Sequence, residues 1–531
     1  MNILTVKDLS LQVSNERLLK SVSFGIKQGE IFALVGESGS GKSLTSLAIM
    51  RLLPEALKVT SGDILLNDSS LFSISEFQMQ KLRGRKIAMI FQEPMTALNP
   101  VMTIGEQVAE VIRLHLDLSE QEIESKVIEL FEEVGLKDAK ARYTWYPHQL
   151  SGGQKQRIMI SMALACEPEL LIADEPTTAL DVTIQAQVLA LLKEIQEKRS
   201  LSILFITHDM GVVVQMADTV AVMRYGEVLE IAQKDDFFRN PRHTYSQSLL
   251  RDALPSKEFR QSNKRDATLL EIKDLKVYFP IKKGFFKRTV GHTKAVDGIS
   301  LSIPKGQTLA LVGESGSGKS TIGTSILQLI ESTDGSIFFN GIDLTKLSQK
   351  AFLPYRRKVQ IVFQDPYSAL NPRMTVGEII REGMVSLNVG LQDKNIQNMI
   401  IKDLLVDVGL AFEHFYRYPH EFSGGQRQRI GIARALAVEP ELIICDEPTS
   451  ALDVSVRSQV LKLLKKLQKE RALSYLFITH DLSIISVIAD EVAVMKEGKI
   501  VEQGLVEEVM ENPQHRYTQK LLASAPQLLT N

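Results

Sequence analysis

The chain has 531 residues, of which 44% are hydrophobic and 24% charged, a balance typical of globular proteins with two to four domains. Its 62 basic and 64 acidic residues leave a net charge of −2, which excludes a generally basic, nucleic-acid-binding surface, so any anion site must be local. Only two cysteines occur, no apolar run approaches the roughly 18 to 20 residues of a membrane span, and the first residues do not read as a signal peptide, so we expect a reduced cytoplasmic protein.

The sequence contains the same unit twice. Lys7-Asp8-Leu9 recurs 266 residues later, Gly36 recurs 277 residues later as Gly313, and the motifs from Gln92 onward recur at an offset of 272. These offsets place an insertion of 11 residues before Gly313 in the second copy and five extra residues between Gly36 and Gln92 in the first. We predict two domains, 1–255 and 268–531, joined by an exposed polar linker at 256–267.

Short apolar runs alternate with helical patterns within each copy. In the first copy the runs are Ile31–Val35, Ile87–Phe91, Leu170–Ala173 and Ile203–Ile206. Runs that are apolar throughout are typical of strands buried on both faces of a mostly parallel sheet. Residues 107–134, rich in Glu, Leu, Ile and Val, predict helices separate from these strands. We therefore expect an α/β core with an attached helical subdomain.

A glycine-rich loop follows the first apolar run of each copy and opens a helix. The two phosphate loops are Gly36-Glu37-Ser38-Gly39-Ser40-Gly41-Lys42-Ser43 and Gly313-Glu314-Ser315-Gly316-Ser317-Gly318-Lys319-Ser320. Glycines let the backbone N–H groups surround a β-phosphate, the lysine reaches the β and γ oxygens, and the last serine offers its hydroxyl to Mg²⁺. Two matches in register with the repeat predict two nucleotide sites.

A second glycine motif predicts an anion seat at the start of another helix. The two SGGQ turns are Ser151-Gly152-Gly153-Gln154 and Ser423-Gly424-Gly425-Gln426. Serine caps the helix, and the glycines let a phosphate approach the free backbone N–H groups without a Cβ in the way. The sequence next to each SGGQ turn does not indicate which phosphate the turn would bind.

Acidic residues and a histidine follow two further apolar runs. Asp174 and Glu175 come directly after Leu170–Ala173, and Asp446 and Glu447 stand at the same place in the second copy. An isolated pair of this kind is more often solvated, but downstream of a phosphate loop the aspartate can hold Mg²⁺ and the glutamate can orient or deprotonate the attacking water. His208 and His480 each follow Phe-Ile-Thr at another strand end, where they can bind a γ-phosphate.

Together with Gln92 in Phe91-Gln92-Glu93-Pro94 and the equivalent Gln364, these motifs occur in the order typical of ABC-type ATPases. Both copies resemble this family, over nearly the whole chain. The resemblance implies two tandem nucleotide-binding domains, each with a RecA-like core and a helical subdomain, that bind ATP and Mg²⁺ and hydrolyse ATP. It adds Gln92 and Gln364 to the metal ligands Ser43, Asp174, Ser320 and Asp446, and makes Glu175, His208, Glu447 and His480 catalytic.

The family resemblance also implies a pseudo-dimer within one chain. The halves would pair head to tail, so that ATP on Lys42 is capped by the SGGQ turn at Ser423 and ATP on Lys319 by the turn at Ser151. ATP would hold the pair closed and hydrolysis would release it, because the closed state binds ATP more tightly.

Three stretches, 88–100, 361–372 and 512–518, are similar to the peptide and nickel importer family, which includes glutathione and microcin C importers with fused ATPase halves. This implies two integral-membrane permease subunits that contact the chain near Gln92 and Gln364. It also implies an extracytoplasmic substrate-binding protein, no nucleic acid, and a peripheral location on the cytoplasmic face of the inner membrane. Oligopeptide, dipeptide, glutathione or a peptide antibiotic remain open as cargo. Because only Cys166 and Cys445 occur, we expect no iron–sulfur cluster of the kind bound by cysteine-rich extensions in this family.

The two copies differ at two places. An aromatic residue that stacks on adenine in this family has candidates in Tyr278 and Phe279, whereas the first copy has Gln12 and Val13. We therefore predict weaker nucleotide binding at Lys42, by about 1 kcal/mol or somewhat more. The insertion predicts a solvated hairpin, with contact to anionic lipid as the alternative; its basic and aromatic residues are Lys282, Lys283, Phe285, Phe286, Lys287 and Arg288.

Other classes of function fit the sequence less well. A soluble tandem ATPase acting on ribosomes or DNA is expected to have a long charged helical segment between its halves, zinc-binding cysteine pairs or a basic surface. An ATP-gated binding module without turnover is disfavoured because both copies retain the acids, the lysine and the histidine. Exporters commonly fuse the ATPase to membrane spans. The sequence therefore favours the energy-coupling subunit of an importer.

Overall fold

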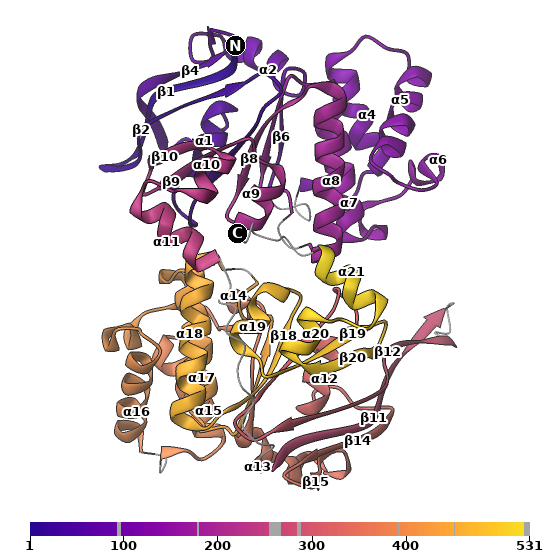
Figure 1. Ribbon diagram of the computed structural model, residues 1–531, viewed down its shortest axis with the longest axis vertical. Coiled ribbons are helices and arrows are strands. Elements are labelled where there is room, and N and C mark those ends of the chain that lie inside the picture. Colours follow the sequence, from indigo (N-terminus) through magenta and orange to yellow (C-terminus); the bar gives the residue numbers. More distant parts are fainter. Residues whose placement is uncertain are drawn as a thin grey trace. The chain divides into compact units, whose positions relative to one another are not determined.

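A computed structural model describes residues 1–92, 97–177, 180–253, 267–283, 288–390, 393–450 and 452–524. These residues form two compact units, one within Met1–Leu254 and the other within Pro255–Ala525. Each unit contains a six-stranded central sheet and a smaller four-stranded sheet, as Figure 1 shows. Most of the predicted linker lies outside the described residues, so its bounds stay a prediction.

The central sheet of the first unit is built around the predicted apolar runs. Its order is β10-β9-β3-β8-β7-β6, and the neighbours from β9 to β6 are parallel. The strands are β3 (Ile31–Val35), β6 (Ile87–Ile90), β7 (Leu170–Asp174), β8 (Ser202–Thr207), β9 (Thr219–Arg224) and β10 (Glu227–Gln233). Every residue of β3, β7 and β8 is buried, which confirms the predicted strands with both faces covered.

Successive residues of these strands pack on opposite sides of the sheet. Phe32 and Leu204 pack toward the small sheet, whereas Ala33 and Phe205 pack on the other face among the helices. Figure 1 shows the small sheet and the helical subdomain on opposite sides of the central sheet. Two apolar layers therefore fix the strand ends, from which the functional residues emerge.

The helices confirm the predicted subdomain over 107–134, which consists of α4 (Ile104–His115) and α5 (Glu120–Glu133). The other helices of the first unit are α1 (Lys42–Ile49), α2 (Glu76–Leu82), α6 (Ala139–Arg142), η1 (Pro147–Gln149), α7 (Gly152–Leu164), α8 (Val182–Arg199), α9 (Met210–Met216), α10 (Lys234–Arg239) and α11 (Thr244–Ala253). Its small sheet has the order β2-β1-β4-β5 and consists of β1 (Asn2–Val13), β2 (Glu16–Lys27), β4 (Leu57–Leu66) and β5 (Ser69–Ser70).

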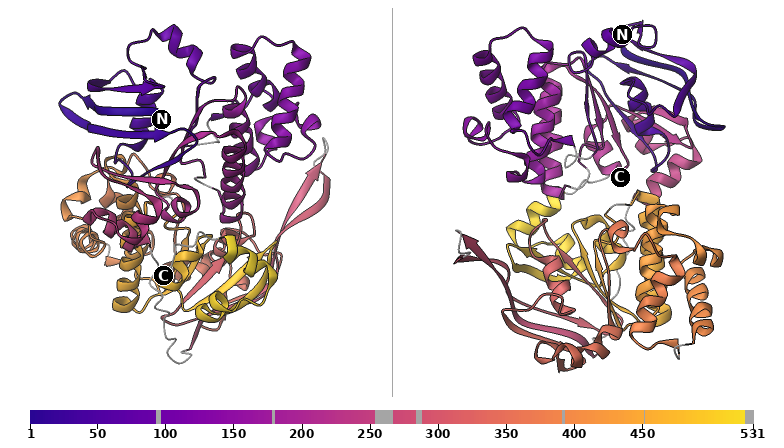
Figure 2. Two further views of the ribbon diagram at one scale, coloured as in Figure 1. Left: turned by 45° about the horizontal axis from the view of Figure 1, so that its top comes forward. Right: turned by 180° about the vertical axis from the view of Figure 1, so that it is seen from behind.

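The second unit repeats this architecture. Its central sheet has the order β16-β17-β18-β13-β19-β20 and contains β13 (Thr308–Val312), β16 (Val359–Val362), β17 (Leu442–Asp446), β18 (Ser474–Thr479), β19 (Glu491–Lys496) and β20 (Lys499–Leu505). Its small sheet contains β11 (Thr268–Lys283), β12 (Arg288–Pro304), β14 (Asp334–Phe339) and β15 (Ile342–Asp343). Both views of Figure 2 place the orange-brown helices of this unit across the central sheet from the rose hairpin of β11 and β12.

The helices of the second unit correspond in order to those of the first. They are α12 (Lys319–Ile326), η2 (Leu344–Lys346), α13 (Gln349–Lys358), α14 (Pro366–Ala369), α15 (Val376–Ser386), α16 (Lys394–Asp407), η4 (Phe412–Tyr416), η5 (Pro419–Glu421), α17 (Gly424–Leu436), α18 (Val454–Arg471), η6 (Leu482–Ile484), α19 (Ile485–Ile488), α20 (Val506–Glu511) and α21 (Arg516–Ser524). In the part of the chain that the structure describes, no helix has the length and apolar character needed to cross a membrane.

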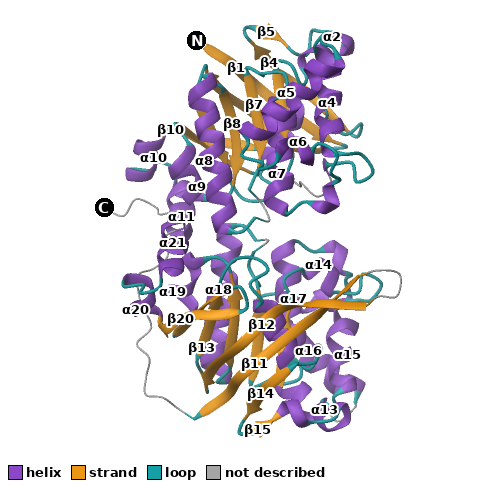
Figure 3. Cartoon of the chain, turned by 90° about the vertical axis from the view of Figure 1, so that its right-hand side faces the viewer, coloured by secondary structure: helices purple, strands orange, loops and turns teal. Residues whose placement is uncertain are grey.

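The insertions that the offsets predict lie in the two small sheets. In the second unit β14 pairs with β11 only as far as Lys276, and β11 and β12 continue as a two-stranded ribbon to the pair Lys283 and Arg288 (Figure 3). The predicted hairpin is therefore present, although residues 284–287, with Phe285, Phe286 and Lys287, lie outside the described residues. In the first unit the extra residues lengthen β4, which pairs with β1 as far as Val13.

Candidate functional site

The phosphate loop of each unit connects the end of a central strand to a helix. β3 ends at Val35 and α1 begins at Lys42, with Gly41 at its N-cap in a left-handed conformation of φ 104°. A Cβ on Gly41 would lie 2.5 Å from Leu19 Cδ2, and one on Gly318 would lie 2.0 Å from the Ala295 carbonyl oxygen. Only glycine fits at this position, because both the backbone conformation and the close neighbour exclude a side chain.

The lysine of each phosphate loop points back into its own loop. Lys42 Nζ donates to the carbonyl oxygens of Gly36 at 2.8 Å and Glu37 at 2.9 Å. Lys319 makes the same bonds, both of 2.8 Å, to Gly313 and Glu314. Both lysines are buried. The loop thus places an ammonium group beside the positive end of a helix, which favours a phosphate.

An aspartate at the end of β7 or β17 reaches the serine that follows this lysine. Ser43 Oγ donates to Asp174 Oδ1 at 3.2 Å, and Ser320 Oγ donates to Asp446 Oδ1 at 2.9 Å. Burial raises the pKa of Asp174 to about 6, against the lowering effect of the Ser43 hydrogen bond, and burial raises the pKa of Asp446 in the same way. A buried carboxylate beside a hydroxyl is a hard oxygen donor set that fits Mg²⁺.

The glutamate next to this aspartate has a left-handed backbone. Glu175 and Glu447 both have φ 47°, and their N–H groups donate to Ile206 and Ile478 at 2.9 Å. This conformation is uncommon outside glycine and costs about 1 to 2 kcal/mol. The sequence carries no signal for this conformation, because the proline after each glutamate favours an extended backbone for the residue before it.

The glutamine and the histidine predicted from the sequence meet at this glutamate. Gln92 Nε2 donates to Glu175 Oε2 at 2.8 Å, and His208 Nδ1 lies 3.0 Å from Glu175 Oε1. In the second unit Gln364 Nε2 donates to Glu447 at 2.9 Å and His480 Nδ1 lies 3.1 Å from the same carboxylate. Residues from three neighbouring strand ends therefore form one network in each unit.

Electrostatics keep both glutamates ionised. Burial alone would raise the pKa of Glu175, but the hydrogen bond and charge of His208 outweigh it and bring this pKa to about 2. Burial would likewise raise the pKa of Glu447, but the hydrogen bond and the charge of His480 outweigh it, so this pKa is lowered. A carboxylate of such low basicity is better suited to hold and orient a water molecule than to remove its proton, since a general base works best with a pKa near the operating pH.

The SGGQ turns begin α7 and α17 with the predicted caps. Ser151 Oγ accepts from Gln154 N at 3.4 Å, and Gln154 Oε1 accepts from Ser151 N at 3.0 Å; Ser423 and Gln426 repeat the pattern. Both serines are exposed. Among the described residues, neither serine side chain forms a hydrogen bond to the phosphate loop of its own unit.

The second glycine of each SGGQ turn has a packing role that the sequence did not indicate. A Cβ on Gly153 would lie 2.5 Å from Ile184 Cγ2, and one on Gly425 would lie 2.2 Å from Val456 Cγ1. Gly153 and Gly425 therefore let α7 and α17 pack closely against α8 and α18. A Cβ on the first glycine of each turn, Gly152 or Gly424, would meet its nearest neighbour at an ordinary distance of 3.8 Å. This glycine stays the candidate for the approach of a phosphate.

The candidate adenine-binding residue Tyr278 lies close to the second phosphate loop. It pairs across the small sheet with Lys294, whose neighbour Ala295 touches Gly318 of the loop. Its hydroxyl donates to Asp297, and Lys294 Nζ lies 5.2 Å from its ring centroid. Phe279, the other candidate, is more exposed. Gln12 occupies the equivalent of Tyr278 in the first unit and donates to the Ser14 carbonyl oxygen instead.

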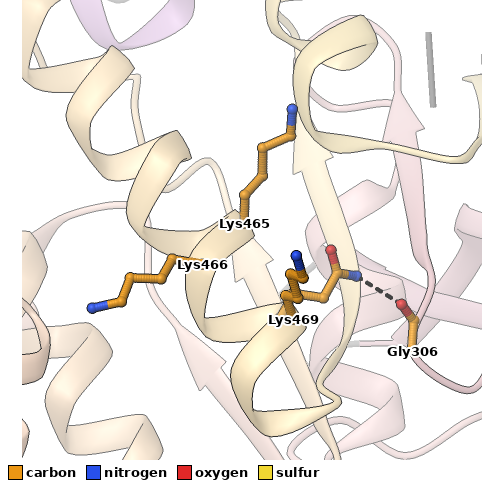
Figure 4. A pocket seen from close by; sticks show the side chains of 5 residues that line it. Gly306, Lys465, Lys466 and Lys469 are labelled. Atoms are coloured by element: carbon orange, nitrogen blue, oxygen red, sulfur yellow. Dashed lines mark hydrogen bonds between the residues drawn. The ribbon is translucent and has the colours of Figure 1, made fainter.

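A basic pocket in the second unit lies away from this chemistry. Gly306 precedes β13, whereas the phosphate loop follows that strand, so the pocket is at the opposite edge of the sheet. Figure 4 shows Lys465 and Lys466 pointing in different directions around it. Gln468 Nε2 donates to the Gly306 carbonyl oxygen at 3.1 Å. The lysines do not converge on one point, and we assign no function to this pocket.

Comparison with known proteins identifies the family. Residues 19–178 and 296–450, more than half of the chain, match the ABC transporter family model. The chain belongs to the ABC transporter family. Residues 229–277 and 501–530 match a second model, the oligopeptide/dipeptide transporter C-terminal region. The predicted family, the α/β fold of two tandem nucleotide-binding domains and the ATPase activity are confirmed, and the chain is the ATP-binding subunit of an ABC importer complex.

Full-length relatives belong to the same part of the family. The chain is 46% identical to the glutathione import ATP-binding protein GsiA of Salmonella paratyphi A, over 99% of this chain and 90% of the relative. It is 46% identical to the peptidoglycan transport ATP-binding protein YejF of Agrobacterium fabrum, over 98% and 96% of the two chains. It is 47% identical to YejF of Escherichia coli, described as an uncharacterized ABC transporter ATP-binding protein, over 98% and 99%. The alternative of an ATPase acting on ribosomes or DNA has no counterpart among these three.

Proposed function

We propose that the chain hydrolyses Mg²⁺-bound ATP at two sites to drive the import of peptides or peptide-like solutes. The observation that carries this proposal is the repeated network of lysine, serine, aspartate, glutamate, glutamine and histidine, whose bonds recur with nearly equal lengths in both units. Because neither unit has lost a member of the network, both sites are hydrolytic.

The oxygen donors at the strand ends would hold Mg²⁺. Ser43, Gln92 and Asp174 form one set, and Ser320, Gln364 and Asp446 form the other. The cation would neutralise charge on the β- and γ-phosphates and supply the counter-charge that the buried aspartates need. Gln92 and Gln364 bond to the glutamate carboxylates, so each glutamine would connect the metal side of the site to the water side.

The two glutamates would position the attacking water, and His208 and His480 would hold these glutamates and contact the γ-phosphate. The phosphate loops, Gly36–Ser43 and Gly313–Ser320, would bind the nucleotide phosphates through their backbone N–H groups and the two lysines. Tyr278, with Phe279 beside it, would contact adenine in the second unit.

We propose that the SGGQ turns act across the repeat, with Ser423 capping ATP on Lys42 and Ser151 capping ATP on Lys319. Support comes from the chemistry of the turns, since both present an exposed, capped helix start with a glycine at which a phosphate can approach. ATP would then close a pseudo-dimer within one chain, and hydrolysis would open it.

The family resemblance and the names of the relatives support a proposal for the partners and the cargo. We propose two integral-membrane permease subunits, which contact the chain near Gln92 and Gln364, and an extracytoplasmic substrate-binding protein, with no role for nucleic acid. The chain would lie peripherally on the cytoplasmic face of the inner membrane. The names of the relatives mention glutathione and peptidoglycan, and two regions of this chain match the oligopeptide/dipeptide transporter C-terminal region. These cargoes share peptide chemistry, so we propose that class.

A pull-down of the tagged chain from detergent-solubilised membranes tests the transport function. We expect two polytopic permease subunits in the eluate and an ATPase rate that changes when these subunits are stripped away. The identity of the permeases would then lead to the cargo. Recovery of the chain with ribosomes or DNA, and with no membrane protein, would contradict the transport function and leave the ATPase chemistry standing.

A further inference from the structure

In the second unit the short helix α14 connects the Gln364 network to the helix that starts with the SGGQ turn. α14 begins at Pro366, two residues after Gln364, and Asp365 caps it by accepting from Tyr367 N at 2.8 Å. α14 packs against α17, the helix that begins at Gly424, and Figure 3 shows the two side by side. The contact therefore links the segment after Gln364 to the helix that begins with the turn at Ser423.

Arg427, in the first turn of α17, makes one of the two contacts with α14. Its guanidinium carbon lies 3.8 Å from the centroid of the Tyr367 ring on α14. Its Nε donates to the Pro419 carbonyl oxygen at 2.7 Å, in the segment just before the SGGQ turn. Arg427 is buried, whereas Tyr367 keeps 63% of its surface exposed, so one face of the ring is covered by the arginine and most of the rest is accessible.

Arg434, two turns further along α17, makes the other contact with α14. Its Nη1 donates to the carbonyl oxygen of Ala369, the last residue of α14, at 2.7 Å. Burial lowers the pKa of this guanidinium, which shows how far it is withdrawn from water. The two arginines thus hold the ring at the start of α14 and the carbonyl at its end. We name Tyr367, Arg427, Arg434 and Ala369 the α14 clamp.

The first unit differs from the second at three of the four positions of this clamp. At the equivalent positions it has Lys155 in place of Arg427, Met162 in place of Arg434 and Met95, which lies outside the described residues, in place of Tyr367. A lysine ammonium is a point charge that cannot lie flat on a ring, and methionine cannot donate to a carbonyl. The residues of the first unit therefore cannot make the two contacts that Arg427 and Arg434 make.

We infer that the α14 clamp positions the SGGQ turn at Ser423. Arg427, Arg434 and Tyr367 are then positioning residues for hydrolysis at the site on Lys42. This inference rests on the proposed pairing of the SGGQ turns across the repeat. Packed helices joined at two points move as one body, and a misplacement of about 1 Å at a catalytic contact can cost up to 100-fold in rate.

The test uses the full-length chain with hydrolysis confined to one site. Glu447→Gln leaves turnover at Lys42, and Glu175→Gln leaves turnover at Lys319. Into each we introduce Arg427→Lys, the residue that the first unit carries, and measure phosphate release with Mg²⁺-bound ATP. We expect turnover at Lys42 to fall about tenfold and turnover at Lys319, in the same unit as the clamp, to change less than twofold. Where a single-glutamine chain turns over too slowly, single-turnover hydrolysis of radiolabelled ATP with the protein in excess gives the same comparison.

A purely local role of Arg427 would give the opposite result, because damage to the second unit would reduce turnover at Lys319. That result would overturn the inference, and so would equal rates with and without Arg427→Lys at both sites. Tyr367→Phe keeps the ring and should behave as the unmodified chain, whereas Tyr367→Ala and Arg434→Met should repeat the loss at Lys42. Lys155→Arg is the matched control in the first unit, and it should change neither rate because Met95, and not a tyrosine, stands at the equivalent of Tyr367.

Ser423→Ala separates this inference from the proposed pairing. If Ser423→Ala lowers turnover at Lys42 while Arg427→Lys does not, the pairing stands and the clamp is rejected. If Ser423→Ala lowers turnover only at Lys319, the SGGQ turn acts within its own unit and the pairing itself is wrong.

Discussion

At the residue scale, the chemistry of each unit depends on a glutamate held in an unfavourable backbone conformation. Glu175 and Glu447 are kept at φ 47° because their N–H groups bond to the next strand and their carboxylates bond to a glutamine and a histidine. Such strain persists only where neighbouring groups fix it, and here they fix the carboxylate at the end of the strand. The arrangement orients the glutamate before any substrate arrives.

Substitution of both glutamates by glutamine tests their role. Glu175→Gln with Glu447→Gln should lower ATP turnover by about 100-fold or more, because glutamine cannot accept a hydrogen bond from water as strongly as a carboxylate. Binding of ATP, measured by fluorescence with a labelled nucleotide, should change less than threefold. Unchanged turnover in the double variant would reject the assignment.

The buried Asp174 reduces the stability of the folded protein when its carboxylate is ionised. Its pKa is about 6 in the folded protein against an ordinary 3.8, so the folded state binds the proton more tightly and loses stability as the pH rises from below 4 through 6. The ionised carboxylate costs the folded state about 3 kcal/mol at pH 7.5. Asp174→Asn removes this cost and can still accept from Ser43.

We therefore expect Asp174→Asn, without Mg²⁺, to raise the melting temperature of the first unit by about 5 to 10 °C at pH 7.5. The gain should shrink by about half at pH 5, where most of the folded wild-type protein already has a neutral Asp174. Differential scanning calorimetry at the two pH values measures it. A gain that does not depend on pH would show that ionisation of Asp174 is not its origin.

At the element scale, the start of each SGGQ helix depends on close packing against the long helix that follows in the chain. Gly425 leaves no room for a methyl group because Val456 of α18 would lie 2.2 Å from it. The first turn of α17 is therefore set by α18 as well as by the α14 clamp. Both contacts place the exposed Ser423 without involving its own hydroxyl.

Gly425→Ala should destabilise the second unit by about 1 to 3 kcal/mol, because the added methyl overpacks the contact between α17 and α18. Val456→Ala, combined with it, removes the clashing methyl groups and should restore most of the loss. Thermal unfolding of the single and double variants measures both effects. Gly424→Ala is the control, since a Cβ there meets only an ordinary contact of 3.8 Å. Equal losses for the single and the double variant would exclude the clash as the cause.

At the scale of the whole molecule, the sequence predicted the two units, their central sheets and the set of residues at the strand ends. This was possible because the buried strands are continuous apolar runs and because each motif follows a strand whose end lies at the same edge of a parallel sheet. The contacts of the α14 clamp could not be predicted, since Arg427 and Tyr367 are 60 residues apart and their pairing depends on where α14 packs. The left-handed glutamates and the packing role of Gly425 also depend on neighbours distant in sequence.

The two units should bind ATP with unequal affinity. Tyr278 lies beside the strand that touches the second phosphate loop, whereas Gln12 stands at its place in the first unit. Stacking of a base on an aromatic ring is worth about 1 to 3 kcal/mol, so the site on Lys42 should bind ATP at least about fivefold more weakly than the site on Lys319. Binding to Lys319→Ala and Lys42→Ala chains, each with one intact site, measures the two affinities. Gln12→Tyr should strengthen binding in the Lys319→Ala chain, and Gln12→Leu, which adds apolar surface without a ring, controls for burial alone. Equal affinities at the two sites would mean that Tyr278 stays on Asp297 and does not contact the base.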